Sequence, residues 1–198
     1  MKKKLFIGTH NTKKLTELSE ILGNDYDLIS FLDITIQEVE ETEKTLEGNA
    51  ILKAKSYYEK IKIPCIADDT GLEVEALEGE PGVYSARYAG EPSDSQKNIK
   101  KLLENLQNKK AIHLSQRKAQ FKTVIAYFDG SNLKLFEGII EGTIALEPKG
   151  EGGFGYDPIF IPKNFDKTFA EMELSLKNKI SHRAIALKKL KNYLTLHS

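Results

Sequence analysis

The sequence predicts an α/β protein built on a mixed sheet, and three stretches of the chain support that prediction. Residues 4–9 form an apolar run followed by a polar turn and an amphipathic segment, which is typical of a strand leading into a helix. Residues 65–67 read as a buried strand that leads into two adjacent carboxylates. Residues 117–146 alternate around the turn signal Asp129-Gly130, which predicts antiparallel strands. At 198 residues the chain can form one sizeable core, so we expect a single domain over residues 1–198.

The spacing of apolar residues predicts the individual elements. In chain order they are strand 4–9, helix 12–22, strand 27–32, helix 45–55, strands 65–67 and 72–77, helix 95–106, strands 117–128, 133–140, 142–146 and 159–161, and helix 181–194. Gly23 is expected to end the first helix. The strand that begins at Cys65 is expected to break at Thr70-Gly71. The side chains of Asp68 and Asp69 should point to opposite sides unless the strand has already ended there.

Composition and charge exclude several classes of function. Lysine plus arginine and aspartate plus glutamate both number 29, so the chain lacks the basic excess of a general nucleic-acid-binding protein. The single cysteine, Cys65, has no partner for an intramolecular disulfide and is expected to fill the core. No apolar run approaches the roughly 18 residues of a membrane span, and the first residues do not resemble a signal peptide. We therefore expect a cytoplasmic protein that binds neither nucleic acid nor a membrane.

Two adjacent carboxylates, Asp68 and Asp69, are the first candidates for catalysis because they follow a buried strand. The turn over residues 9–14 places hydroxyls, an amide and two lysines at a helix start, where free backbone N–H groups and the helix dipole favour an anion such as phosphate. A polar turn and an ordinary N-cap by Asn11 or Thr12 would explain the same residues without a ligand.

An acidic run over residues 38–43 leads into the predicted helix 45–55. A carboxylate at this entrance could bind a metal ion, although most acidic runs are solvated surface. Asn49 and Lys53 are four residues apart and therefore share one face of the helix, where they could line a cleft.

A glycine-rich loop over residues 150–158 could bind a planar group. Four glycines surround Phe154, so the backbone is expected to need unusual dihedral angles or a close approach to another group. A planar ring could stack on Phe154 or Tyr156. A flexible surface loop is the alternative interpretation.

A cluster of hydrogen-bond donors precedes and opens the last helix. Ser181 is a candidate N-cap, which places His182 and Arg183 in the first turn, where cations oppose the helix dipole. With Lys177 just upstream, these side chains could donate hydrogen bonds to a ligand. Surface charge explains the cluster equally well.

Together, these motifs resemble one family, the inosine/xanthosine triphosphate pyrophosphatases, from Thr9 to about Leu187. The matching segments are Thr9-x-Asn11-x-x-Lys14, Glu41-Thr42-x-x-Thr45-x-x-x-Asn49-Ala50-x-x-Lys53-Ala54, Ala67-Asp-Asp-Thr-Gly-Leu72, Pro81-Gly-Val-Tyr-Ser-Ala-Arg87, Gly152-Gly-Phe-Gly-Tyr-Asp-Pro158, Thr168-x-Ala170-Glu171 and Ser181-His-Arg183. The resemblance implies hydrolysis of inosine, deoxyinosine and xanthosine triphosphates to the monophosphate and pyrophosphate, with Mg²⁺ required. It also implies an elongated α/β fold with a long mixed sheet, two lobes around a nucleotide cleft, and usually a homodimer.

The resemblance also implies roles for individual residues. Asp69 is the expected general base, Asp68 its support, and Lys14 the cation that neutralises phosphate charge. Mg²⁺ is expected on Asp69 and Glu40, with Glu41 as the alternative to Glu40. The expected substrate-binding residues are Thr9, His10, Asn11, Thr12, Lys13, Lys14, Lys53, Thr70, Phe154, Gly155, Tyr156, Asp157, Lys177, His182 and Arg183. In the base pocket, Phe154 would stack on the purine and Asp157 would read its edge.

Some positions depart from the family pattern. They are His10, Glu43, Gly48, Thr70 and Ala184, which stand where glycine, glycine, glutamate, serine and glycine are common. His10 could narrow the phosphate turn, and Gly48 removes a possible ligand of metal or water. Thr70 keeps its hydroxyl and should have no effect.

Three other functions fit parts of the sequence. A nucleotide sensor without turnover would keep the pocket, but it has no need of a positioned base such as Asp69. A nucleic-acid-binding protein fits the balanced charge poorly. A phosphatase that releases orthophosphate from the γ-position is the nearest competitor among enzymes, and product analysis separates it from a pyrophosphatase.

Overall fold

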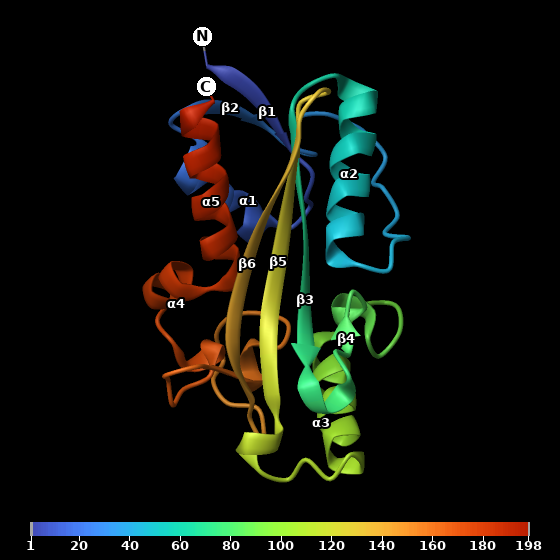
Figure 1. Cartoon of the computed structure of the whole chain (residues 1–198), viewed down its shortest axis with the longest axis vertical. Coiled ribbons are helices and arrows are strands. Elements are labelled where there is room, and N and C mark those ends of the chain that lie inside the picture. The colour runs from blue at the N-terminus through green and yellow to red at the C-terminus, as the bar shows by residue number, and fades with distance from the viewer. Residues whose placement is uncertain (1, 198) are drawn as a thin grey trace. The chain divides into compact units, whose positions relative to one another are not determined.

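The computed structural model describes residues 2–197, apart from the side chain of Lys13. Its main elements are β1 (Lys3–Ile7), α1 (Thr12–Leu22), β2 (Tyr26–Ile29), α2 (Leu46–Ile61), β3 (Cys65–Val74), β4 (Pro81–Gly82), α3 (Ser95–Asn108), β5 (Lys118–Phe128), β6 (Leu133–Ile144), β7 (Phe160–Pro162), α4 (Leu174–Ile180) and α5 (His182–Leu196) (Figure 1). The strands form one mixed sheet in the order β2-β1-β3-β5-β6-β7, with β4 paired to β3. The predicted α/β class, a mixed sheet with flanking helices, is confirmed.

The chain divides into two compact units. Unit 1 comprises residues 1–69, 123–137 and 186–198, and unit 2 comprises residues 70–122 and 138–185. Strands β3, β5 and β6 and helix α5 each contribute residues to both units. The expected single domain over residues 1–198 stays a prediction, and each unit is described by itself.

In unit 1, helix α2 lies on one side of the strands, and α1 and α5 lie on the other (Figure 1). Side chains alternate along β1, so Leu5 and Ile7 join the core beneath α1 and α5. Phe6 faces the other way and packs edge-on against Tyr57 of α2, with 5.5 Å between ring centroids. Because both faces of β1 are covered, it reads as a continuous apolar run.

Parallel pairing in unit 1 brings the first turn of the chain to the carboxylates. Strand β1 pairs in parallel with both β2 and β3, and Gly8 N–H donates to the Ile66 carbonyl at 2.8 Å. The turn that follows β1 therefore lies beside the stretch of β3 that contains Asp68 and Asp69. Helix α1 ends at Leu22 and is followed by Gly23, as predicted.

Helix α2 begins as predicted but is longer. Thr45 is its N-cap, and the Thr45 hydroxyl accepts from Gly48 N–H at 3.0 Å. The helix runs on to Ile61 and ends where Lys62 adopts a left-handed conformation, with φ of 54°. Its buried side chains are Leu46, Asn49, Ala50, Lys53, Ala54 and Tyr57. Two of these side chains, Asn49 and Lys53, place polar groups in the interior.

Unit 2 has a hydrophobic core to which β3, β5, α3 and the segment that follows β6 all contribute. Leu72 of β3 shares a core with Leu102 and Leu106 of α3. Phe121, Phe160 and Phe169 form an aromatic group in the same core, with ring centroids 4.7 Å apart for Phe121 and Phe160 and 5.2 Å apart for Phe160 and Phe169. Within residues 2–197, no helix is long and apolar enough to cross a membrane.

The expected break at Thr70-Gly71 is wrong. Strand β3 runs without interruption from Cys65 to Val74, and a short 3₁₀ turn, Glu75–Leu77, replaces the last part of the strand expected over 72–77. Pairing at both ends keeps the chain in the strand, because β1 pairs with residues 65–66 and β4 pairs with residues 72–73. Local turn formers are overridden by these long-range pairings.

The expected interruption between strands 133–140 and 142–146 is also wrong, since β6 is one strand over Leu133–Ile144. Gly142 does not mark a turn. A Cβ atom at that position would lie 2.3 Å from the Ile161 carbonyl oxygen of β7, so glycine permits β7 to approach.

Helix α4 is absent from the expected elements, and the second strand is shorter than expected. Leu174 of α4 is 67% exposed and Leu176 is 37% exposed, so this helix lacks the buried stripe that reveals a helix in sequence. Strand β2 spans only Tyr26–Ile29, because Asp33 turns the chain by accepting hydrogen bonds from the Ser30 backbone and hydroxyl.

Candidate active site

The carboxylates of Asp68 and Asp69 lie on opposite sides of β3 because the strand is continuous through them. Asp68 Oδ2 accepts a hydrogen bond from Lys14 Nζ of α1 at 2.6 Å. Asp69 Oδ2 accepts from Asn49 Nδ2 of α2 at 2.9 Å. Both aspartates are buried, so these partners offset the cost of removing the carboxylates from water. One carboxylate is thus paired to a cation and the other to a neutral amide.

Lys53 is the charged centre of the α2 side of this cluster. Its ammonium donates to the Asp68 carbonyl oxygen at 2.6 Å and to Glu41 Oε1 at 2.5 Å. Burial alone would lower the pKa of Lys53, but the charges of Asp68, Asp69 and Glu41 together outweigh it and raise that pKa. Lys53 therefore stays a cation in a buried position that is 7% exposed.

The turn after β1 forms a capped helix start. Asn11 Oδ1 accepts from Lys14 N–H at 3.2 Å, and Thr9 Oγ1 accepts from Asn11 N–H at 3.2 Å. Of the two candidate N-caps, Asn11 and Thr12, it is Asn11 that makes the capping hydrogen bond. The His10 side chain does not extend over this turn. Its ring stacks on the ring of Phe31, with 3.9 Å between the ring centroids. Thr12 is exposed, and the side chain of Lys13 lies outside the described part of the chain.

The donor set of this cluster suits a hard cation. Glu41, Asp68 and Asp69 supply carboxylate oxygens only, which are the ligands that Mg²⁺ takes while keeping some of its waters. Among residues 2–197 no group of three histidine, cysteine, aspartate or glutamate side chains is already arranged around a metal position. Glu41 contacts Lys53, whereas Glu40 is exposed. The residues therefore fit Mg²⁺ by their chemistry, and either glutamate remains a candidate ligand.

In unit 2, the glycine-rich loop is folded around Asp157. Asp157 Oδ2 accepts from Phe154 N–H at 2.6 Å and pairs with Lys177 Nζ of α4 at 2.5 Å. Gly153 has a φ of +76°, and a Cβ atom there would lie 2.1 Å from the Asp157 carboxylate. Only glycine therefore allows the loop to close on Asp157. Gly155 also adopts a left-handed conformation, with φ of +60°.

The two aromatic residues of this loop differ in exposure. Phe154 is 39% exposed, whereas Tyr156 is 5% exposed and donates from its hydroxyl to the Ser85 carbonyl at 2.8 Å. Burial raises the pKa of Tyr156, so its hydroxyl stays a donor. Phe154 is thus the ring that a planar ligand can stack on, and Tyr156 anchors the loop.

The cationic donors of unit 2 surround Phe154 and the aromatic group beneath it. Lys177 Nζ lies 4.9 Å from the Phe154 ring centroid, and Arg183 Cζ lies 5.6 Å from it. His182 stacks on Phe121 of β5, with 4.7 Å between centroids and 15° between planes. Ser181 Oγ accepts from Ala184 N–H at 3.2 Å, so its predicted N-cap role is confirmed.

Some site residues were missed or underrated by sequence reasoning. Phe121 of β5 is not among the predicted site residues, yet its ring stacks against His182. Ser85 carried no separate signal beyond its place in the motif Pro81–Arg87. Thr70 lies within β3 and is half-buried, rather than in a turn. These contacts join distant parts of the sequence, which local spacing does not reveal.

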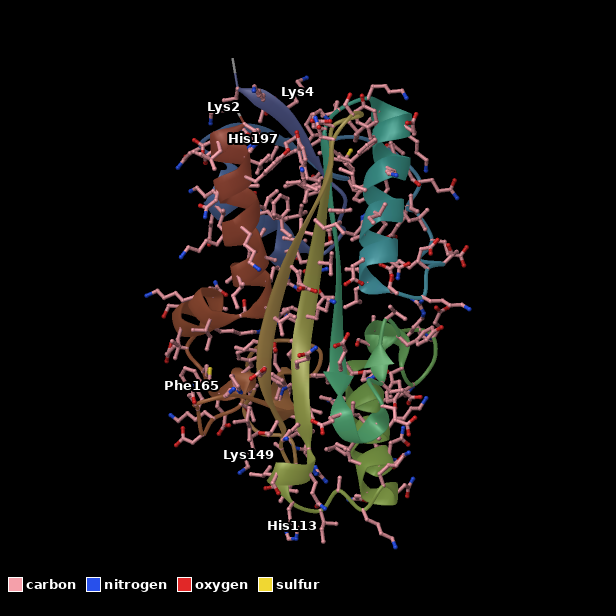
Figure 2. All side chains as sticks on the ribbon, viewed as in Figure 1. Lys2, Lys4, His113, Lys149, Phe165 and His197 are labelled. Atoms are coloured by element: carbon pink, nitrogen blue, oxygen red, sulfur yellow. The ribbon has the colours of Figure 1, made fainter. Side chains whose placement is uncertain are left out.

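A groove of about 800 Å³ in unit 2 is separate from these clusters. Its lining includes Glu73, Gln120, Thr143, Lys163 and Phe165, the last of which is labelled in Figure 2. The residues predicted for the site are not among those that line it. Size alone therefore does not mark the site, and the arrangement of charge does.

Cys65 is expected to resist thiol reagents in the folded protein. Burial raises its thiol pKa from 9.0 to about 12, so the thiolate fraction at pH 8 falls to about 10⁻⁴. Titration with an aromatic disulfide at pH 8 should show slow reaction of the native chain and fast reaction in urea. Equally fast reaction in both would contradict burial of the thiol.

The chain has an α/β fold with buried carboxylates and lysines beside a capped helix start, and it has cations around an exposed aromatic ring. These features are those of a nucleotide-hydrolysing enzyme. A model of the Ham1 family matches residues 5–193. A dITP/XTP pyrophosphatase of Porphyromonas gingivalis is 50% identical over 192 residues, covering 96% of this chain and 97% of that protein. One from Bacillus subtilis is 51% identical over 195 residues, covering 97% of each.

Solved structures agree with these sequence matches. The Ham1 protein of Staphylococcus aureus has a TM-score of 0.90 and 41% identity, covering 99% of this chain and 100% of that chain. A HAM1 protein from Coxiella burnetii has a TM-score of 0.92 and 38% identity, covering 98% of each. This chain belongs to the Ham1 family.

Proposed function

We propose that this protein hydrolyses non-canonical purine nucleoside triphosphates, namely those of inosine, deoxyinosine and xanthosine, to the monophosphate and pyrophosphate. The observation that carries the proposal is the Asp68-Asp69 pair, held between Lys14, Asn49 and Lys53 beside a helix start that suits phosphate. Relatives from Porphyromonas gingivalis and Bacillus subtilis that match nearly the whole chain are named dITP/XTP pyrophosphatases. Removal of such nucleotides would cleanse the cellular nucleotide pool.

Unit 1 binds the triphosphate. The backbone N–H groups at the start of α1, the hydroxyls of Thr9 and Thr12, and the ammonium of Lys14 offer hydrogen bonds and positive charge to the phosphates. Lys14 neutralises the charge that moves onto the leaving pyrophosphate. Asp69 orients a water molecule and accepts its proton as the water attacks the α-phosphorus, and Asp68 supports it by holding Lys14.

Asp69 and a glutamate at position 40 or 41 would hold Mg²⁺. The ion, when bound, offsets phosphate charge and helps to position the triphosphate. The contact of Glu41 with Lys53 favours Glu41 as a member of the charged cluster, whereas the resemblance favours Glu40. Both glutamates belong to the segment that leads into α2.

Replacing the metal-binding glutamate is expected to raise the Mg²⁺ concentration needed for half-maximal activity about 10-fold or more, because an amide is a weaker ligand than a carboxylate. Glu40→Gln and Glu41→Gln are compared by Mg²⁺ titration, with Glu59→Gln on the exposed part of α2 as control. Only one of the two variants should show the shift. If neither does, the ligand lies elsewhere in the chain.

Unit 2 binds the base. Phe154 stacks on the purine, and Lys177, His182 and Arg183 donate to the 6-oxo group that hypoxanthine and xanthine share. Adenine presents a 6-amino donor there, so a donor left unpaired against it costs about 1–3 kcal/mol. Asp157 holds Lys177 and the loop, and its carboxylate is also the group proposed to read the edge of the base.

Arg183→Ala is expected to lower the ratio of kcat/KM for inosine triphosphate over adenosine triphosphate by about 10-fold, since one donor to the 6-oxo group is lost. Steady-state rates with both nucleotides give the ratio. Lys179→Ala, an exposed change on the neighbouring helix α4, is the matched control. An unchanged ratio in Arg183→Ala would remove Arg183 from base selection.

We also propose that the enzyme acts as a homodimer in the cytoplasm, as the family resemblance implies. Light scattering on the eluting protein tests the dimer. The function itself is tested by product analysis with the triphosphates of inosine, xanthosine, adenosine and guanosine. Pyrophosphate from the first two, with little from adenosine triphosphate, is expected. Orthophosphate would indicate attack at the γ-phosphorus, and tight binding without product would indicate a sensor.

A further inference from the structure

Asn49 connects the carboxylate of Asp69 to the loop before α2. Its Nδ2 group donates to Asp69 Oδ2 at 2.9 Å, and its Oδ1 accepts from the backbone N–H of Glu43 at 2.9 Å. The Asn49 side chain is fully buried, at 0% exposure. Because both ends of the amide are bound, the position of the Glu43 backbone fixes the orientation of Asn49 and, through it, of Asp69.

Glycine at position 48 has no backbone reason to be there. Gly48 lies in the first turn of α2 without a left-handed φ, and alanine is more favourable than glycine inside a helix. A side chain would nevertheless meet the loop. A Cβ atom at Gly48 would lie 2.8 Å from Glu43 Cβ, 3.0 Å from Thr45 Oγ1 and 3.1 Å from Glu43 Cγ. The Glu43 side chain therefore occupies the space that a residue larger than glycine would need.

We propose that Glu43 and Gly48 form a clamp that positions Asp69 through Asn49. Packing of the Glu43 stem on Gly48 holds the Glu43 N–H on Asn49, and Asn49 holds the carboxylate. Both are positioning residues, because neither is assigned a contact with the substrate. The inference rests on the proposed role of Asp69 in hydrolysis, and it explains two departures from the family pattern, Glu43 and Gly48, as one spatial pair.

The clamp makes Gly48→Ala an unusual substitution. Helix propensity favours alanine in α2, whereas the crowding of Glu43 and Thr45 Oγ1 opposes it, so the midpoint of thermal unfolding should change little. The added Cβ atom crowds Glu43, which displaces the Glu43 N–H from Asn49 and misplaces Asp69. We expect kcat with inosine triphosphate to fall about 10-fold or more, with a much smaller change in KM, because small misplacements of a reacting group cost up to about 10²-fold.

A double-mutant cycle tests the clamp. Glu43→Gly removes the two crowding atoms that belong to Glu43, leaves Thr45 Oγ1 at 3.0 Å, and should lower kcat about threefold by loosening the loop. Adding Gly48→Ala to Glu43→Gly should then lower kcat only slightly further. The double variant should therefore have a higher kcat than Gly48→Ala alone. Glu43→Ala keeps the Cβ atom at 2.8 Å, so it should relieve Gly48→Ala far less. This pair of rescues separates contact with Glu43 from a general effect on the helix.

Two results would overturn the clamp. One is wild-type kcat in Gly48→Ala, and the other is a loss of kcat that Glu43→Gly does not relieve. Asp69→Asn is measured beside the cycle to keep the two ideas apart. If Asp69→Asn is inactive and the cycle shows no coupling, the clamp fails and the role of Asp69 stands. If Asp69→Asn keeps its activity, the proposed role of Asp69 fails first.

Discussion

Replacing Asp69 by asparagine is expected to lower kcat for inosine triphosphate by about 10²–10⁴-fold, because the water loses its general base. The fold should persist, since asparagine keeps the shape of the side chain and retains an oxygen that can accept from Asn49. Steady-state kinetics measure the loss, and urea unfolding measures the free energy of unfolding of the variant.

Asp166→Asn, an exposed change in unit 2, controls for the substitution itself and should keep wild-type kcat. Asp68→Asn shows whether the two carboxylates have different roles. Asp68 pairs with Lys14, so its loss should act largely through phosphate binding and raise KM more than Asp69→Asn does. An Asp69→Asn enzyme that turns over at the wild-type rate would remove Asp69 from the mechanism.

Replacing Lys53 by methionine is expected to have the largest effect on stability. Methionine fills a similar volume but removes the ammonium whose charge stabilises Glu41, Asp68 and Asp69, although Asp68 keeps Lys14 as a second cation. Removal of one partner from a buried charged cluster costs about 3–5 kcal/mol. The free energy of unfolding in urea, measured with a chelator present, should fall by that amount, and kcat should fall with it.

Lys55→Met is the matched control, since Lys55 lies on the same helix but is exposed, with its ammonium 5.8 Å from the Phe128 ring centroid. It should change the free energy of unfolding by about 0.5 kcal/mol or less. Equal stability of the two variants would show that Lys53 does not hold the carboxylate cluster together.

The sequence predicted those parts of the fold that local patterns determine. Helix α1 follows from the spacing of Leu15, Leu18 and Leu22, and its end at Gly23 follows from the stop signal. The buried strand at Cys65 is equally clear as an apolar run. These elements depend on neighbours within a few residues, which a sequence displays directly.

Other parts depend on residues distant in sequence. Thr70-Gly71 reads as a turn, but pairing with β1, 59 positions earlier, and with β4, 8–10 positions later, keeps this stretch within one strand. Local propensity therefore gave the wrong answer there. Gly142 reads as a break in the strand. Glycine stands there because the carbonyl of Ile161, on a neighbouring strand, leaves no room for a side chain. Helix α4 has no buried stripe, so no periodicity was present to detect it.

The candidate site was predictable as a set of motifs but not as a set of contacts. The positions of Asp68, Asp69 and Lys14 follow from their motifs, since each stands at a strand or a helix start. The contacts within the site do not follow from motifs. The three-dimensional fold brings Asn49 to Asp69 and Phe121 to His182. The roles assigned to these residues in catalysis and binding stay predictions until the variants are measured.

The most direct test of the account is hydrolysis of inosine triphosphate in water enriched in oxygen-18, with the products separated and weighed by mass spectrometry. Attack at the α-phosphorus by water held at Asp69 places the heavy oxygen in inosine monophosphate and leaves pyrophosphate unlabelled. Label in pyrophosphate would place the attack at the β-phosphorus, and labelled orthophosphate would place it at the γ-phosphorus. Either result would contradict the proposed reaction.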